Sequence, residues 1–218
     1  MRRMRIAALA AAVLALAGCK TTVNSEIAVS ELQGGQSKEL PGDLYVEVAS
    51  CNDFEDSRKP SKTLLDVQQK IPGVFPTAVY KECFRQKMDS YAHFSMPLFL
   101  DLDKDGKLGS EQTINVISND TAMLGLAVPD ALQKQIASAK KDALGSLDLS
   151  VLVKVTNDTK EEFRFVVGAA YIDDHPVTDR VLVAPAGASF VVRLSDVAVD
   201  AAVAGQNPAV LKVAPPKS

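Results

Sequence analysis

The 218-residue chain has no tryptophan, two histidines and three cysteines. So little cysteine excludes a disulfide-rich scaffold, and so little histidine leaves few candidates for a general base. The sequence also lacks a glycine-rich phosphate loop, a dinucleotide-binding fingerprint and an H-E-x-x-H zinc motif. We therefore expect a protein that is not an enzyme, with no resident cofactor.

An excess of charge of either sign is missing as well. The chain has 24 Lys and Arg against 27 Asp and Glu, a formal charge of −3. Nucleic-acid binding needs clustered positive charge, so we expect no nucleic-acid partner. The hydrophobic fraction of 47% is too high for a disordered chain, which favours one folded domain.

Long hydrophobic runs are absent except near the N-terminus. Three arginines within the first five residues precede an apolar stretch over residues 6–18, which is followed by Cys19. The stretch is shorter than the roughly 20 residues of a transmembrane helix and is typical of a secretory signal. The sequence therefore predicts a signal peptide over residues 1–18. Its removal would leave 21 Lys and Arg against 27 Asp and Glu, a formal charge of −6.

The end of this signal, Leu16-Ala17-Gly18-Cys19, resembles the lipobox of bacterial lipoproteins. The resemblance implies cleavage before Cys19, a diacylglyceryl group on its thiol and a fatty acid such as palmitate on its new amino group. Several acyl chains together anchor a protein stably to a membrane. Lys20 stands where an inner-membrane lipoprotein commonly has Asp, which implies the outer membrane. The alternative is a conventional signal segment with an incidental cysteine.

With Cys19 assigned to the lipid, Cys51 and Cys83 remain. Disulfides persist outside the cytoplasm, so we expect these two cysteines to pair and to close a loop of about 33 residues. The alternative is a reactive thiol or a soft-metal pair. That alternative has little support, because there is no C-x-x-C spacing and no nearby histidine pair.

The pattern of residues predicts an α+β fold, with two or three helices packed on a mainly antiparallel sheet of sequential hairpins. We expect a lipid-anchored tether over residues 19–42 and a globular domain over residues 43–195. The Ala- and Pro-rich segment 196–218 is expected to be partly disordered.

Three helices are expected. The first is capped by Ser61 or Thr63 and ends before Pro72. The second covers residues 77–88 and carries Cys83 on one face. The third covers residues 129–145, where apolar residues recur at helical spacing between an N-terminal proline and a C-terminal glycine.

Alternating apolar residues predict the strands. Residues 93–118 read as a hairpin closed by a three-residue loop, in a register that pairs Phe94 with Val116. Residues 149–156 and 163–171 read as a second hairpin. Shorter strands are expected at 44–50, 181–183 and 189–194.

The tip of the first expected hairpin resembles the first half of an EF-hand calcium loop. Asp101, Asp103 and Asp105 occupy the first, third and fifth positions, and Gly106 the sixth. The twelfth position lacks the bidentate carboxylate, although Glu111 lies one place before it. The resemblance implies a calcium site formed by these four acidic residues, against the alternative of an acidic hairpin tip.

His175 follows Asp173 and Asp174, an arrangement in which a carboxylate could orient an imidazole. No serine lies in a Gly-x-Ser-x-Gly setting, so a solvated turn is favoured over a hydrolase site. His93 is expected to be a half-buried structural residue at the start of a strand.

Three hypotheses of function follow. The first is a lipid-anchored lipoprotein of the cell envelope, non-catalytic, that binds an envelope protein partner or serves as a structural module in the periplasm. The second is a calcium- or small-ligand-binding module. The third, a special case of the first, is an exclusion-type lipoprotein encoded by a phage or another mobile element.

Overall fold

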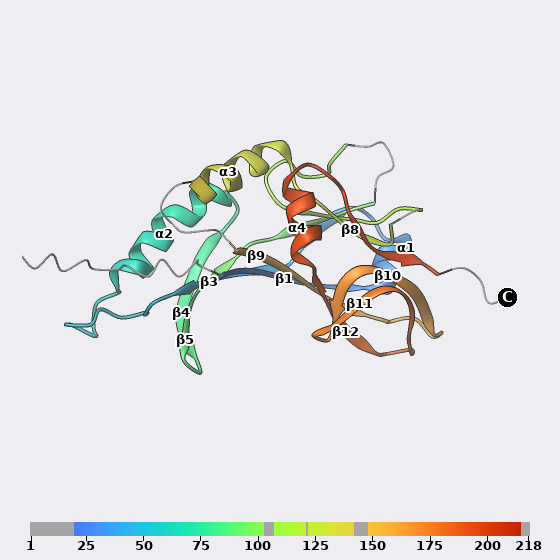
Figure 1. Ribbon diagram of the computed structural model, residues 1–218, viewed down its shortest axis with the longest axis horizontal. Coiled ribbons are helices and arrows are strands. Elements are labelled where there is room, and N and C mark those ends of the chain that lie inside the picture. The colour runs from blue at the N-terminus through green and yellow to red at the C-terminus, as the bar shows by residue number, and fades with distance from the viewer. Residues whose placement is uncertain (1–19, 103–106, 121, 142–147, 215–218) are drawn as a thin grey trace, which may run out of the picture.

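The computed structural model describes residues 20–102, 107–120, 122–141 and 148–214. These residues form one strongly curved sheet of 13 strands together with four helices (Figure 1). The helices are α1 (Val29–Gly34), α2 (Lys62–Val74), α3 (Asp130–Lys141) and α4 (Asp196–Val203). The strands are β1 (Lys20–Ala28), β2 (Lys38–Leu40), β3 (Gly42–Val48), β4 (Val79–Gln86), β5 (Asp89–Ser95), β6 (Leu98–Asp101), β7 (Asn115–Ile117), β8 (Leu124–Ala127), β9 (Asp148–Thr156), β10 (Phe163–Ile172), β11 (His175–Ala184), β12 (Ser189–Leu194) and β13 (Ala209–Val213).

The sheet is mixed. Its order is β2-β6-β7-β8-β13-β10-β12-β9-β1-β3-β5-β4, with β11 paired to β10. The pairs β1–β9 and β6–β7 are parallel, and the other pairs among the described strands are antiparallel. The expected α+β class is therefore confirmed, and the sheet is mainly antiparallel as expected, but it is not built of sequential hairpins alone.

The ladder between β2 and β6 continues the ladder between β3 and β5 in the same register. Leu40 lies opposite Leu98, Asp43 lies opposite Ser95, and the Met96 amide donates to the Gly42 carbonyl between them at 2.9 Å. This shared ladder joins the two ends of the strand order, so the sheet folds back on itself.

Helices α2, α3 and α4 lie on one side of the sheet (Figure 1). Residues facing them from β1, β3, β5 and β9 are buried, and the residues between them are not. Ser61 caps α2 as expected, because its side chain accepts from the Leu64 amide. The helix continues past Pro72 to Val74, since the Phe75 amide still reaches the Ile71 carbonyl at 2.8 Å.

The expected bounds of the folded domain are too narrow at both ends. Residues 20–28, expected in a tether, form β1 between β3 and β9 near the middle of the sheet. At the other end, residues 196–203 form α4 and residues 209–213 form β13. Strands β1 and β13 each pair with a strand distant in sequence, which composition alone does not indicate.

The helix expected over residues 77–88 is wrong, because Val79–Gln86 is the edge strand β4. A bulge at Lys81 shifts the register between Tyr80 and Glu82. The extra residue breaks the period-two pattern, and the apolar residues then fall by coincidence at helical spacing.

Both expected hairpins are wrong in their pairing. Phe94 lies opposite Leu44 and Tyr80, while Val116 lies opposite Leu100 in a parallel pair and opposite Leu126. The expected tip at 104–106 lies outside the described residues. Strands β9 and β10 form as expected, but β12 lies between them. Local register cannot reveal these distant partners.

The helix expected over residues 129–145 is confirmed for the described residues as α3. Leu132, Ile136 and Ala139 form its buried stripe, at the helical spacing noted in the sequence, and the Gln133 backbone amide donates to the carbonyl of Pro129 in the first turn.

Candidate functional site

Two of the four residues of the expected calcium site, Asp103 and Asp105, lie outside the described residues. Asp101 is 3% exposed, and its carboxylate accepts from the Gly109 amide at 3.0 Å. Glu111 is exposed. No group of three or more His, Cys, Asp or Glu side chains in the described part of the chain could hold a metal ion. The calcium site stays a prediction, and the contact of Asp101 shows one structural use of this carboxylate.

His175 lies at the exposed turn between β10 and β11. Its Nδ1 is 2.8 Å from the carbonyl oxygen of Asp173, not from a carboxylate. The Asp173 carboxylate instead accepts from the Val191 amide at 2.8 Å. Asp173 and Asp174 both have positive φ, 47° and 65°, which suits a two-residue hairpin loop. This geometry agrees with a solvated turn.

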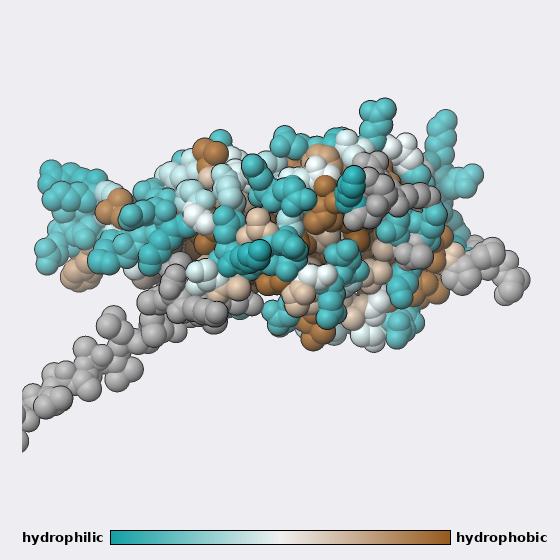
Figure 2. Space-filling view, turned by 90° about the horizontal axis from the view of Figure 1, so that it is seen from above, coloured by the Kyte–Doolittle hydropathy of each residue, from teal (hydrophilic) through white to brown (hydrophobic). Residues whose placement is uncertain are grey.

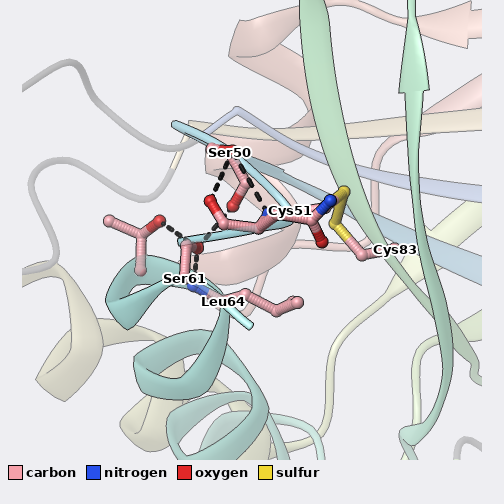
Figure 3. The surroundings of a disulfide bond; sticks show 7 residues. Ser50, Cys51, Ser61, Leu64 and Cys83 are labelled. Carbon is pink, nitrogen blue, oxygen red and sulfur yellow. Dashed lines mark hydrogen bonds between the residues drawn. A yellow bond between two sulfur atoms is a disulfide. The ribbon is translucent and has the colours of Figure 1, made fainter. Parts of the chain in front are cut away.

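The expected disulfide between Cys51 and Cys83 is present, with Cα atoms 5.6 Å apart (Figure 3). It joins the segment after β3 to the edge strand β4. Cys51 also accepts at its carbonyl from the Ser61 amide at 3.0 Å, and the Ser61 hydroxyl donates to the Ser50 carbonyl. The disulfide therefore fixes β4, the end of β3 and the start of α2 to one another.

The side of β4, β5, β3, β1 and β9 opposite the helices carries a cluster of aromatic rings. Tyr45 of β3 stacks on His93 of β5, with ring centroids 4.8 Å apart. Phe84 of β4 packs edge-on against Tyr45 at 6.0 Å and tilted against Tyr91 at 5.9 Å. We call this cluster, with the side chains of strands β1 and β9 beside it, the aromatic face.

Acidic side chains surround these rings. His93, 18% exposed, lies between Asp43 and Glu82, with its Nε2 2.7 Å from one carboxylate and its Nδ1 3.7 Å from the other. Burial raises the pKa of the Tyr45 hydroxyl, and the charges of Asp43 and Glu82 raise it further. His93 is half-buried as expected, but its two carboxylate neighbours depend on strand pairing.

Two shallow hollows adjoin on the aromatic face. One has a volume of about 480 Å³ and lies between Asp43, Leu152 and Val191. The other, of about 420 Å³, lies between Thr22, Phe84 and Tyr91. Asn24 and Tyr45 line both hollows, and the Asn24 Oδ1 is buried without a hydrogen-bond partner. A ligand on this face would therefore meet aromatic rings and carboxylates.

Sequence reasoning missed this face for an identifiable reason. The segment containing Phe84 was expected to be helical, and the segment containing Asn24 was expected to be a tether. Tyr45 and His93 were each placed on a strand, but nothing local indicates that these strands pair. Buried and more exposed residues alternate along β1, but Thr21 and Ser25 occupy two of the buried positions, so the polar and apolar residues of 21–27 do not themselves indicate a strand.

No helix among the described residues is both long and apolar enough to cross a membrane.

Comparison with protein families identifies the chain. The model of a domain of unknown function, DUF7424, matches residues 21–217. The chain therefore belongs to the DUF7424 family, whose domain covers nearly all of it, including β1 and β13. Searches of curated proteins and of solved structures each found no match.

Proposed function

We propose that this protein is a lipid-anchored lipoprotein of the bacterial cell envelope that binds a protein partner through its aromatic face and has no catalytic activity. The observation that carries the proposal is this uncovered side of the sheet, where the half-buried rings of Tyr45, Phe84 and Tyr91 lie beside acidic residues. A sheet side that only had to be solvated would not need clustered aromatic rings.

Two observations support an exported, anchored chain. Residues 16–19 match the lipobox, and Cys51 and Cys83 form a disulfide, which persists in an oxidising compartment. Lys20 directly after Cys19 favours the outer membrane, whose periplasmic side would then present the aromatic face to envelope proteins.

The charge of the aromatic face indicates the chemistry of the partner. Asp43, Glu47 and Glu82 lie on strands next to the rings, so a segment bearing arginine or lysine would find both carboxylates and ring faces. The protein itself shows this combination elsewhere. The Arg193 guanidinium lies 3.7 Å from the ring centroid of Tyr171 and 3.6 Å from the Asp174 carboxylate.

Labelling with palmitate tests the anchor. The full chain, expressed in a Gram-negative bacterium, is expected to incorporate labelled palmitate, and Cys19→Ala is expected to lose the label. Cys51→Ala is the matched control and should keep it. Label that survives in Cys19→Ala would contradict lipidation at this cysteine.

Nuclear magnetic resonance tests the binding face. A short peptide of alternating arginine and serine should shift the amide signals of β3, β4 and β5, and a glutamate–serine peptide should not. The double variant Asp43→Asn, Glu82→Gln should weaken binding about tenfold, equivalent to about 1.4 kcal/mol. Glu161→Gln, which removes an exposed carboxylate in the loop between β9 and β10, is the control. Equal binding by the double variant and the wild type would contradict a cationic partner.

A further inference from the structure

One end of the sheet carries two fully exposed hydrophobic side chains on separate segments. Phe54 lies in the loop 51–61 between β3 and α2 and is 102% exposed, and Met88 lies in the turn between β4 and β5 and is 81% exposed. They are the most exposed large hydrophobic residues in the described part of the chain. Exposed apolar side chains at loop tips favour contact with another apolar phase.

The disulfide holds these two segments together. Cys51 precedes Phe54 by three residues, and Cys83 precedes Met88 by five. A hollow of about 450 Å³ lined by Cys51, Asn52, Arg85 and Met88 lies between them. In Figure 1 the loop projects to the left of β3, and the tip of the β4–β5 hairpin projects downward in the same half of the molecule.

Both segments have a defined conformation. The Asp53 amide donates to the Lys59 carbonyl at 2.9 Å, which closes the loop around Phe54. In the hairpin, Gln86 pairs with Asp89, and Lys87 takes the first turn position with φ of 57°. Glycine is the usual residue there, because a lysine in this region is strained. The chain thus tolerates strain at a turn that exposes Met88.

The residue that follows the proposed lipid attachment site lies at this same end. Strand β1 begins at Lys20, and Cys19 directly precedes it in the sequence, so no further residue separates the proposed anchor from the sheet. Thr21 lies opposite Val46, two residues before β3 ends and leads to the loop. Because β5 runs in the same direction as β1, its first residue, Asp89, lies at this end too.

We propose that Phe54 and Met88 insert into the lipid interface next to the anchor, so that this end of the sheet faces the membrane. The inference rests on the proposed lipid anchor. With no spacer after Cys19, the domain cannot stand away from the bilayer, and the disulfide keeps both tips on the side of the anchor.

Apolar contact, not headgroup charge, drives this insertion. The loop carries acidic residues at Asp53, Glu55 and Asp56 and basic residues at Arg58 and Lys59, which nearly balance. The Arg58 guanidinium is already held by both oxygens of the Asp56 carboxylate at 2.9 and 3.1 Å. Figure 2 shows the left end of the molecule as largely hydrophilic with isolated hydrophobic residues.

The absence of tryptophan supplies the probe. We would purify the lipidated full chain as Phe54→Trp, Met88→Trp and Val197→Trp, each with a single tryptophan, and reconstitute it into neutral phosphatidylcholine vesicles. Val197 is the matched control, because it is 79% exposed on α4, away from the loop and the hairpin. All three positions are exposed, so the fold should tolerate the substitutions.

We expect blue-shifted emission and at least twofold quenching by brominated phosphatidylcholine for Phe54→Trp and Met88→Trp, but neither for Val197→Trp. Palmitate labelling of the same samples separates the two proposals. Labelled protein whose tryptophans at 54 and 88 are no more quenched than the one at 197 would overturn the insertion and leave the anchor intact. Unlabelled protein would overturn the anchor and the insertion together.

Discussion

Two regions of one sheet bury their side chains in different ways. Strands β1, β3 and β5 alternate between buried and more exposed residues, whereas all four residues of β8 and two of the three in β7 are buried. The first region has helices on one side only. The second lies where the sheet folds back on itself, and α4 contacts β8. A continuously buried strand serves packing, whereas a strand with one uncovered side is available for binding.

The difference also explains where the disulfide lies. The edge strand β4 has β5 as its single neighbour in the sheet order and mostly exposed residues, so burial contributes little to holding it. Cys51 and Cys83 supply a covalent link at this weakly packed edge. No disulfide joins β7 or β8 among the described residues. Burial of their side chains on both sides of the sheet stabilises these strands instead.

Removal of the disulfide should have the largest effect on stability. For a sequence separation of 32 residues, the double variant Cys51→Ala, Cys83→Ala should lower the free energy of unfolding by about 3.5 kcal/mol. Urea unfolding with and without reductant measures this loss, and Cys19→Ala serves as the control. A wild-type midpoint that reductant leaves unchanged would contradict a stabilising link at the open edge.

A pair of leucine variants compares the two regions directly. Leu126 of β8 is 1% exposed, so Leu126→Ala should lower the free energy of unfolding by about 3 kcal/mol through lost burial and a residual cavity. Leu152 of β9 lies on the aromatic face and is only partly buried, so Leu152→Ala should cost less than about 1 kcal/mol. Similar losses, measured by urea unfolding, would erase the distinction between the regions.

Acidic pH should weaken the contact between α1 and β2. Glu31 of α1 accepts from the Ala28 amide at 2.8 Å and pairs with Lys38 of β2, and these contacts lower its pKa. Its stabilising contribution is present above its ordinary pKa and is lost as the pH falls through the lowered value. Because Glu31 and Lys38 are both partly exposed to solvent, the effect should be under about 1 kcal/mol.

Thermal unfolding between about pH 5 and pH 3 measures this contribution. The variant Glu31→Gln should lose less stability over that range than the wild type, and the control Glu161→Gln, at an exposed loop position, should behave as the wild type does. Identical pH dependence in Glu31→Gln and the wild type would contradict a stabilising role of the Glu31 carboxylate.

Alkaline pH should have the smallest effect on stability, through the tyrosine hydroxyls of the aromatic face. Burial and the neighbouring charges raise the pKa of Tyr45, and burial with Asp89 and Glu47 raises that of Tyr91. Stability from these neutral hydroxyls is present below their ordinary pKa of about 10 and is lost as the pH rises through the raised values. Absorbance titration at alkaline pH should show late-ionising tyrosines, and Tyr45→Phe should remove one. An unchanged titration in Tyr45→Phe would contradict the enclosed setting of this ring.

How far the sequence predicts this fold depends on whether the determinants of an element are local. Helix α3 has all of its determinants within its own segment, from the preceding Pro129 to the stripe of Leu132, Ile136 and Ala139. Strand β1 does not, because Thr21 and Ser25 occupy buried positions and disguise its apolar pattern. Strand β4 is disguised further by its bulge.

The candidate site divides in the same way. The pairing of Cys51 with Cys83 follows from cysteine count and context, and the disulfide is present in the structure. The resemblance of residues 16–19 to a lipobox stays a prediction. The aromatic face does not follow, because Asn24, Tyr45, Phe84 and His93 come from four different strands. Only the order of the strands brings these residues together.

The sequence by itself therefore determined the α+β class, the well-formed helix α3, the alternating strand β9 and the cysteine pair. These features depend on spacing within a segment or on the small number of cysteines. Tertiary structure alone decided that residues 20–28 lie within the sheet, that β12 lies between β9 and β10, and that one side of the sheet stays uncovered. Strand pairing over more than a hundred residues is a property of the packed chain, since each strand offers the same backbone hydrogen bonds to any partner.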